Sequence, residues 1–475
     1  MRVVLAILGV LLVAVGTLAW LKTEQQPPRV TLVAPVDAIG RATVVDLVVQ
    51  AASPGLRSVV VSLQTTHGPV KLISETYPKA GLLGSGVTEK RLHVVADAPG
   101  LNLPEGPATL EVLVDTYAWR FGRSARKPQL AQPVSVDLTP PRIDLLTTQH
   151  NARLGGVELA VFRQSPDTVR SGVAVDKYFF PSVTGYFADP AVALAFFAIP
   201  QDLTAEVRPQ VVASDAAGNE RQFTLPVTIK PRKFADRSLA IDDDFLARKV
   251  PELQRENKLP PAADFVQGYL AINGDLRRQN EARIREVTAT SAREPQWDGV
   301  FRRQSNAAPL SSFADRRAYT YNGQVIDHQT HLGYDLASLK ASPVEAAQAG
   351  TVVFADNLGI YGNTVILDHG LGIFSLYGHL SAIAVRSGER VKAGQSLGQT
   401  GETGLAGGDH LHFSMMLHGV HVDPVEWWDA HWLRDHVTPK LAMFPRPSGS
   451  TPDSKAGTDP PKHEQGDARP PTRAR

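Results

Sequence analysis

The chain has 475 residues, of which 43% are hydrophobic and 20% are charged, and its formal net charge is +1 at pH 7. This length predicts three or four domains, and the near-zero charge gives no overall field that would recruit nucleic acid. The sequence contains no cysteine. Disulfides, thiolate zinc sites and cysteine nucleophiles are therefore excluded, which leaves His, Asp and Glu as metal ligands.

The N-terminus carries an uncharged run, Val3–Leu21, between Arg2 and Lys22. Its length approaches the roughly 20 residues needed to span a bilayer. We therefore predict a single-pass transmembrane anchor within residues 1–28, with a cleaved signal peptide as the alternative. Either interpretation places Arg2 on the cytoplasmic side of the cytoplasmic membrane and the bulk of the chain outside the cytoplasm, in the periplasm.

Two β-rich units are predicted next. Residues 29–139 contain short β-rich runs such as Val44–Gln50 and Thr109–Tyr117, separated by Pro-Gly and Gly-rich turns, which is typical of a β-sandwich. A second unit covers residues 140–230, and its DAAGN turn at Asp215–Asn219 resembles bacterial immunoglobulin-like modules. We expect both immunoglobulin-like sandwiches to act as spacers or binding modules.

A short helical segment is predicted at residues 231–308. Helical spacing appears first in Phe245, Leu246, Val250 and Leu253. It appears again, after the Pro260–Pro261 pair, in Phe265, Tyr269, Leu270 and Ile272. We expect two helices whose aromatic side chains pack in a core against a neighbouring domain. At the other end of the chain, residues 445–475 have almost no apolar side chains and predict a disordered tail.

The region 309–444 is predicted to be a β domain, and histidines cluster within it. Its strand-like runs are separated by Gly and Asp turns, as hairpins require. Three histidine motifs follow one another: HLGYD (His331–Asp335), YGHL (Tyr377–Leu380) and DHLHF (Asp409–Phe413).

The HLGYD motif offers two metal ligands if the chain bends. In a straight strand His331 and Asp335 would lie about 13 Å apart, too far to share one ion. Gly333 disfavours a helix here, and glycine allows a sharp bend of the backbone at little cost in conformational energy. One histidine of HLHF would complete two imidazoles and a carboxylate, which is the three-ligand pattern of a catalytic zinc site.

The remaining histidines would be free to move protons. His410 and His412 alternate along a predicted strand, so both face one side about 7 Å apart. Zinc lowers the pKa of a bound water to about 7, where a neighbouring imidazole can accept its proton. A second imidazole can donate a hydrogen bond to a developing oxyanion. Such a set is sufficient for amide hydrolysis without a nucleophilic side chain.

Together, these motifs resemble the LytM/M23 family of zinc metallopeptidases, the lysostaphin-like endopeptidases. The resemblance covers about a quarter of the chain and rests on SSFADRR, HLGYDLA, GNTVILDHG, SLYGHL and GLAGGDHLHF in this order. It implies a mainly β chain that ends in an antiparallel β metallopeptidase domain. It also implies one zinc ion per chain, held by His331, Asp335 and His412, with His410 as the general base and His379 stabilising the transition state.

Members of this family cut peptide cross-links of bacterial peptidoglycan, so the resemblance implies peptidoglycan peptides as substrate, with protein regulators as further partners. One departure is visible: the position after HLHF is commonly Glu in the family and is Ser414 here, which puts the support of a metal ligand in doubt. Two alternatives remain. One is a catalytically inactive M23-like regulator or scaffold that activates a separate wall hydrolase. The other is an adhesin-like or envelope-scaffold protein in which the immunoglobulin-like modules of residues 30–230 carry the function.

Other residues of this region receive structural interpretations. His328 competes with His331 for the first ligand position but is expected in a solvated loop. His369 is expected to be structural. Tyr377 is expected on the same side as His379, with core packing favoured over contact with substrate. The remaining expectations are surface positions for His418, His421 and His431, and core positions for Trp427 and Trp428.

Overall fold

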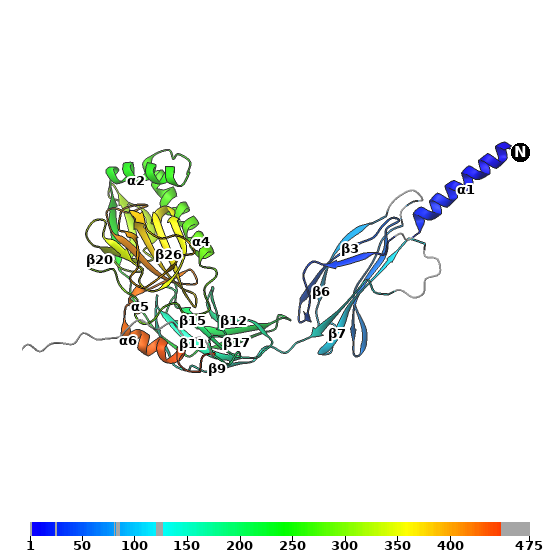
Figure 1. Ribbon diagram of the computed structural model, residues 1–475, viewed down its shortest axis with the longest axis horizontal. Helices are drawn as coiled ribbons and strands as arrows, with labels where there is room; N and C mark the ends of the chain where they lie inside the picture. Colours follow the sequence, from blue (N-terminus) through cyan, green and yellow to red (C-terminus); the bar gives the residue numbers. More distant parts are fainter. Residues whose placement is uncertain (1, 24–25, 80, 82–85, 120–126, 448–475) are drawn as a thin grey trace, which may run out of the picture.

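The computed structural model describes residues 2–23, 26–79, 81, 86–119 and 127–447. The disordered tail predicted for 445–475 lies almost entirely outside these residues. Helix α1 (Arg2–Lys22) extends from the first β unit at the N-terminal end of the molecule (Figure 1). Among the described residues, no helix is long and apolar enough to cross a membrane. The membrane anchor therefore stays a prediction.

The first β unit consists of two sheets. A five-stranded sheet has the order β2-β8-β7-β4-β5, and a three-stranded sheet has the order β1-β3-β6. Alternate residues of β3, such as Val45, Leu47 and Val49, are buried against the five-stranded sheet in one core. The predicted β-rich runs are confirmed. The strands are β1 (Arg29–Leu32), β2 (Ala38–Ile39), β3 (Thr43–Gln50), β4 (Leu56–Thr65), β5 (Gly68–Thr76), β6 (Glu89–Ala96), β7 (Gly106–Thr116) and β8 (Leu130–Val136).

The second β unit has two four-stranded sheets, in the orders β14-β15-β11-β9 and β13-β12-β16-β17, and a parallel pair of β10 with β18. The DAAGN turn joins β16 to β17 as predicted, and the backbone N–H of Asn219 donates to Asp215 Oδ1 at 2.9 Å. The mainly β architecture is confirmed, while the immunoglobulin-like relationship stays a prediction. The strands are β9 (Ile143–Leu145), β10 (His150–Arg153), β11 (Val157–Gln164), β12 (Thr168–Val175), β13 (Tyr178–Pro181), β14 (Val183–Thr184), β15 (Val192–Ala198), β16 (Gln210–Asp215), β17 (Glu220–Thr224) and β18 (Val227–Lys230).

The C-terminal domain is built on a large antiparallel sheet with the order β20-β23-β31-β27-β26-β25-β29, to which β32 adds beside β31. Smaller sheets β24-β30-β28 and β19-β21-β22 flank it. The strands are β19 (Asp236–Ile241), β20 (Ala308–Ser311), β21 (Arg316–Tyr321), β22 (Gln324–Thr330), β23 (Tyr334–Ala337), β24 (Pro343–Glu345), β25 (Gly350–Asn357), β26 (Asn363–Gly370), β27 (Ile373–Leu380), β28 (Ala382–Ile383), β29 (Arg390–Val391), β30 (Ser396–Gln399), β31 (Leu411–Leu417) and β32 (Val420–Val422).

The helical segment covers one face of this large sheet (Figure 1). It contains α2 (Asp243–Glu256), α3 (Phe265–Ala271), a π-helical turn η1 (Ile272–Leu276) and α4 (Arg277–Val287). The sequence predicted only two helices, since α4 is strongly polar and lacks a clear apolar face. Helix α3 begins after its N-cap Asp264 rather than at the prolines, because that carboxylate accepts the N–H of Gln267. Phe265 is 48% exposed, so its core assignment was wrong.

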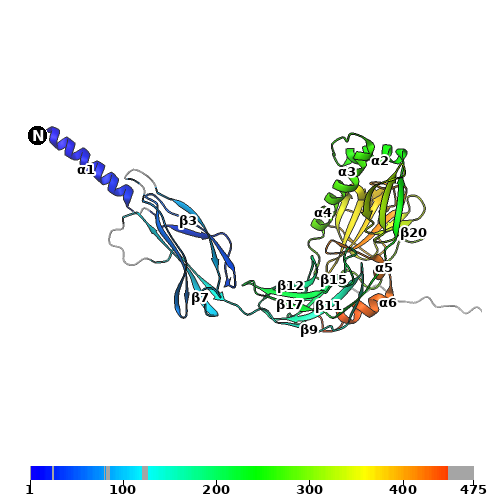
Figure 2. The same cartoon turned by 180° about the vertical axis from the view of Figure 1, so that it is seen from behind.

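The second β unit docks against the C-terminal domain, and the two share one continuous hydrophobic core. The last helices of the chain run beside β9 and β11 (Figure 2). They are α5 (Pro424–Trp427), α6 (Ala430–Trp432), a π-helical turn η3 (Leu433–Val437) and α7 (Thr438–Leu441). Buried Glu158 accepts hydrogen bonds from Lys440 Nζ at 2.7 Å and His436 Nδ1 at 3.0 Å. The large sheet of the C-terminal domain is therefore joined to the second β unit by a shared core and by these buried contacts.

Candidate metal centre and active site

Three of the predicted residues converge on one point. Asp335 on β23 lies opposite His412 on β31 in the strand register, and His331 lies just before β23. His331 Nε2 and His412 Nδ1 are 3.0 Å apart, and they lie 2.9 and 3.0 Å from Asp335 Oδ1. The bend required at Gly333 is present, because His331 and Asp335 meet instead of lying a strand length apart.

Gly333 is needed for close packing rather than for a left-handed backbone. A Cβ atom at this position would lie 2.6 Å from both His412 Nε2 and Ser414 Oγ. Any larger residue would therefore push against a ring of the cluster and against the hydroxyl that supports it.

Each imidazole of the cluster has its second nitrogen bound elsewhere. His331 Nδ1 lies 3.0 Å from the Ser312 carbonyl oxygen, so its N–H donates there and Nε2 carries the free lone pair. His412 Nε2 lies 3.0 Å from Ser414 Oγ, which in turn donates to the Leu332 carbonyl at 2.8 Å. Ser414 thus accepts the N–H of His412, and Nδ1 of His412 faces the cluster.

The carboxylate of Asp335 contacts Arg317 through one oxygen and the histidines through the other. Arg317 Nη2 donates to Oδ2 at 2.8 Å, which leaves Oδ1 directed at the histidines. Burial raises the pKa of Asp335, but the surrounding imidazoles of His331, His410 and His412 outweigh it and hold that pKa well below its usual range. Two imidazole nitrogens and one carboxylate oxygen, each oriented by an outer hydrogen bond, fit a zinc ion with an open coordination position.

His379 and His410 lie beside this cluster and face the same space. Their ring centroids are 4.8 Å apart, and His379 lies 5.8 Å from His412 in the same measure. In both, Nδ1 is 2.8 Å from a backbone carbonyl, that of Thr403 for His379 and that of Gly408 for His410. Both rings therefore present Nε2 to the pocket. Burial, and then the neighbouring His410, lowers the pKa of His379 well below its ordinary value.

The backbone of His379 explains why Tyr377 does not accompany it. His379 has φ +64°, in the left-handed region, so simple strand alternation ends at this residue. Tyr377 points into the core instead, where its hydroxyl accepts the N–H of Ala347 at 2.7 Å. The expected common side for the two residues was therefore wrong, while the preferred core packing of Tyr377 is confirmed.

The other interpreted residues divide into confirmed and corrected positions. His369 is structural, since it is buried and bonds to the Ala349 carbonyl and Ser375 Oγ. Trp427 is buried as expected, and His328 lies in β22 outside the metal cluster. His421 is not a surface group: it is only 6% exposed, because it packs beneath α4 with Nε2 3.3 Å from Glu281.

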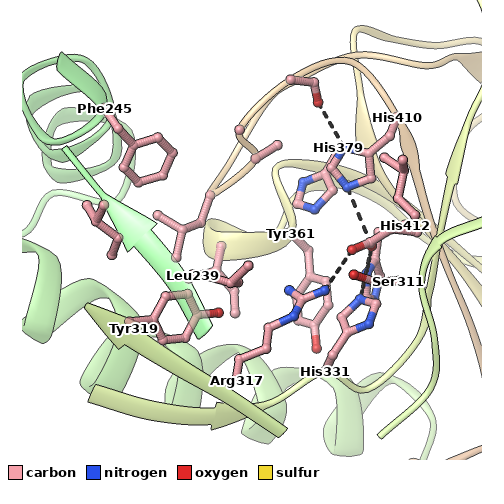
Figure 3. A pocket seen from close by; sticks show the side chains of 18 of the residues that line it. Leu239, Phe245, Ser311, Arg317, Tyr319, His331, Tyr361, His379, His410 and His412 are labelled. Atoms are coloured by element: carbon pink, nitrogen blue, oxygen red, sulfur yellow. Dashed lines mark hydrogen bonds and ion pairs between the residues drawn. The ribbon is translucent and has the colours of Figure 1, made fainter. Parts of the chain in front are cut away.

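A cavity of about 460 Å³ contains the histidine cluster at one end (Figure 3). The opposite wall comes from the segment preceding the β domain, with Leu239 and Ile241 from β19 and Phe245 from α2. The sequence predicted a core position for Phe245 and assigned no role to Leu239 or Ile241, because apolar side chains at regular spacing carry no sign of a pocket. Only the parallel pairing of β19 with β21 brings them to the site.

Comparison with known proteins agrees with this geometry. The model of peptidase family M23 matches residues 329–424, which include the five histidine and aspartate positions above. The chain contains an M23 peptidase domain. This M23 domain lies at the C-terminal end of the chain, as predicted from the sequence.

Curated relatives match about a quarter of the chain or less. The DD-carboxypeptidase/endopeptidase Mpg of Neisseria meningitidis is 39% identical over 122 residues, 25% of this chain and 28% of that protein. The peptidoglycan DD-endopeptidase ShyC of Vibrio cholerae is 36% identical over 114 residues, 24% of this chain and 26% of that protein. A lipoprotein NlpD/LppB homolog of Pseudomonas aeruginosa is 42% identical over 98 residues, 20% of this chain and 32% of that protein. The chain thus spans about a third or less of the length of these relatives.

Proposed function

We propose that the protein is a zinc-dependent endopeptidase that hydrolyses peptide cross-links of bacterial peptidoglycan. The observation that carries the proposal is the convergence of His331 Nε2, His412 Nδ1 and Asp335 Oδ1 within 3.0 Å of one another. The names of the two DD-endopeptidase relatives support peptidoglycan peptides as the substrate class.

In this proposal His331, Asp335 and His412 hold one zinc ion per chain. When bound, zinc supplies a Lewis acid that polarises a carbonyl and lowers the pKa of water. Because Nδ1–H of His410 donates to the Gly408 carbonyl, its Nε2, which lies 3.4 Å from Asp335 Oδ1, is the atom that accepts the proton of the attacking water. It then returns a proton to the leaving amine, so the amide bond is replaced by a carboxylate and an amine.

His379 must gain a second ring proton before it can donate a hydrogen bond to the substrate. Its Nδ1–H is engaged by the Thr403 carbonyl, so Nε2 can donate to a developing oxyanion only when the ring carries a second proton. We assign His379 to stabilisation of the transition state as an imidazolium that forms next to the growing negative charge. Because His379 is buried, its positive charge is unfavourable until the negative charge of the transition state forms beside it.

The test measures zinc content and release of muropeptides from purified peptidoglycan by the full-length protein. We expect one zinc per chain, cleavage of cross-links, loss of cleavage with a chelator and recovery with added zinc. Substitution His412→Ala removes both zinc and cleavage, whereas the exposed His431→Ala changes neither. One zinc per chain without any cleavage would favour the alternative, a regulator that activates a separate wall hydrolase.

We also propose that the M23 domain works outside the cytoplasm, held by an N-terminal membrane anchor. The uncharged run Val3–Leu21 supports this, and the proposed substrate is an extracytoplasmic polymer. Protease added to spheroplasts should digest the M23 domain of the native chain. A domain protected until the cells are lysed would contradict this location.

A further inference from the structure

The wall of the active-site cavity contributed by the helical segment holds a buried hydroxyl that has no hydrogen-bond partner within the described residues. Tyr269 on α3 lines the cavity and is 1% exposed, yet its hydroxyl has no hydrogen-bond partner within the described residues. Its ring is fixed edge-on against Tyr319, with centroids 5.9 Å apart. A buried hydroxyl without a partner is unfavourable, so its retention in a cavity points to a ligand atom that reaches it.

Two guanidinium groups line the same cavity. Arg317 uses Nη2 to bind Asp335, but its buried Nε has no partner within the described residues. Arg277, the first residue of α4, donates only to the backbone carbonyl and side-chain oxygen of Asn273, and no carboxylate of the described chain pairs with it. Figure 3 shows the Arg317 side chain, which comes from β21, pointing toward the histidine cluster.

The acidic groups near these donors are already engaged. Asp335 is bound by Arg317 and the histidines, and Asp409 accepts Thr400 Oγ1 at 2.6 Å. Glu281, whose charge lies close enough to Arg277 to interact with it, accepts the Tyr361 hydroxyl at 2.7 Å and pairs with His421. Within the described residues, the Tyr269 hydroxyl and Arg317 Nε therefore remain without a partner, and Arg277 forms no ion pair with a carboxylate, although Arg317 Nη2 is paired with Asp335.

We propose that Tyr269, Arg277 and Arg317 form a subsite for a free carboxylate of the bound peptide. A planar carboxylate accepts several N–H and O–H bonds at once, which matches guanidinium and hydroxyl donors. The neighbouring wall of Leu239, Ile241 and Phe245 is apolar, so it suits a small apolar side chain beside that carboxylate better than a strongly hydrated phosphate. The catalytic consequence rests on the proposed function: the enzyme would select cross-links that carry a free carboxylate near the cleaved amide.

The test measures binding of N-acetyl-D-alanine and of its amide to the full-length protein without turnover, first free of metal and then zinc-loaded. We expect the acid to bind the metal-free protein at least about tenfold tighter than the amide, because a hydrogen bond to a charged group is lost in the amide. Because no hydrolysis is needed, this result is independent of whether the protein is an active peptidase.

Three variants locate the binding. Arg277→Met should weaken binding of the acid by about tenfold or more, and Tyr269→Phe by about threefold to tenfold. Tyr269→Phe removes only an unpartnered hydroxyl, so the fold is retained even if Arg277→Met is unstable. Arg278→Met is the matched control, since Arg278 is exposed and pairs with Asp275, and it should change nothing.

Several results would overturn the proposed subsite. Equal affinities for acid and amide, or full binding by both Arg277→Met and Tyr269→Phe, would overturn the subsite. Binding that appears only with zinc and ignores these substitutions would place the carboxylate on the metal and also overturn it. Inorganic phosphate that binds more tightly than the acid, with the same dependence on Arg277, would contradict the assignment to a carboxylate.

Discussion

Ser414 Oγ lies 3.0 Å from His412 Nε2 and accepts its hydrogen bond, while donating its own to the Leu332 carbonyl. This contact fixes the His412 tautomer and directs Nδ1 at the metal cluster. The resemblance to the M23 family raised Ser414 as a position where support of a ligand was in doubt. The structure shows that serine supplies this support through its hydroxyl.

Ser414→Ala should weaken zinc binding by about 10- to 100-fold, as expected when an outer hydrogen bond to a ligand is lost. The measurement is competition for zinc with a chromophoric chelator. Ser171→Ala is the matched control, because Ser171 is another buried hydrogen-bonded serine, far from the site in the second β unit. Unchanged zinc affinity in Ser414→Ala would show that the hydroxyl has no part in orienting His412.

Gly333→Ala should disrupt the cluster, because the added Cβ would lie 2.6 Å from His412 Nε2. We expect zinc affinity to fall at least about tenfold and the free energy of unfolding to fall by about 1–3 kcal/mol, as for other overpacked sites. Gly407→Ala serves as control, since a Cβ there meets no atom within 4 Å although Gly407 lines the same cavity. Equal zinc affinity in the two variants would mean that the cluster adjusts freely.

His369 should make the domain sensitive to acid. Burial lowers its pKa to about 4, although the hydrogen bond to the Ala349 carbonyl acts in the opposite direction. The unfolded chain therefore binds a proton between about pH 6.5 and 4 that the folded chain does not. Stability from this group is complete above pH 6.5 and is lost as the pH falls, by about 3 kcal/mol at pH 4.

Urea unfolding at several pH values, on wild type and His369→Gln, measures this contribution. The difference in unfolding free energy between the two proteins should shrink steadily as the pH is lowered from 7 to 4. His67→Gln, which replaces an exposed histidine, is the control variant. A constant difference for His369→Gln would mean that His369 is not the source of the acid sensitivity.

Glu158→Ala should loosen the second β unit from the C-terminal helices. It removes the carboxylate that pairs with Lys440 and His436 and leaves the ammonium group buried. Breaking such a buried pair on one side lowers the free energy of unfolding by about 3–5 kcal/mol. Asp202→Ala, which breaks the exposed pair with Lys177, should cost less than about 1 kcal/mol. Similar losses in both variants would contradict a special role for Glu158.

The sequence predicted the parts of the site that depend on local order. HLGYD, YGHL and DHLHF fall on or beside neighbouring strands, and the required bend at Gly333 was deduced from strand geometry alone. Helix α2 was also predicted, since its apolar residues recur at regular spacing. Patterns of this kind act over a few residues and are visible in one chain.

The missed features depend on long-range contacts. Helix α4 is almost wholly polar and is held by contacts such as Asn280 Oδ1 with the backbone N–H of Ile360. The parallel pairing of β19 with β21 brings Leu239 to the metal pocket, although β21 begins about 75 residues later in the chain. His421 was assigned to the surface because nothing local signals that Glu281 lies beside it. Tertiary packing, not local pattern, determines these positions.

The most direct test compares His410→Ala with His412→Ala, two substitutions two residues apart in DHLHF. For each purified full-length protein, zinc content and the rate of cross-link cleavage are measured together. We predict that His410→Ala keeps one zinc per chain and loses about 10²- to 10⁴-fold in rate, as expected for a proton-transfer residue. His412→Ala should lose both zinc and activity. Loss of zinc to the same degree in both variants, or full activity in either, would contradict the account.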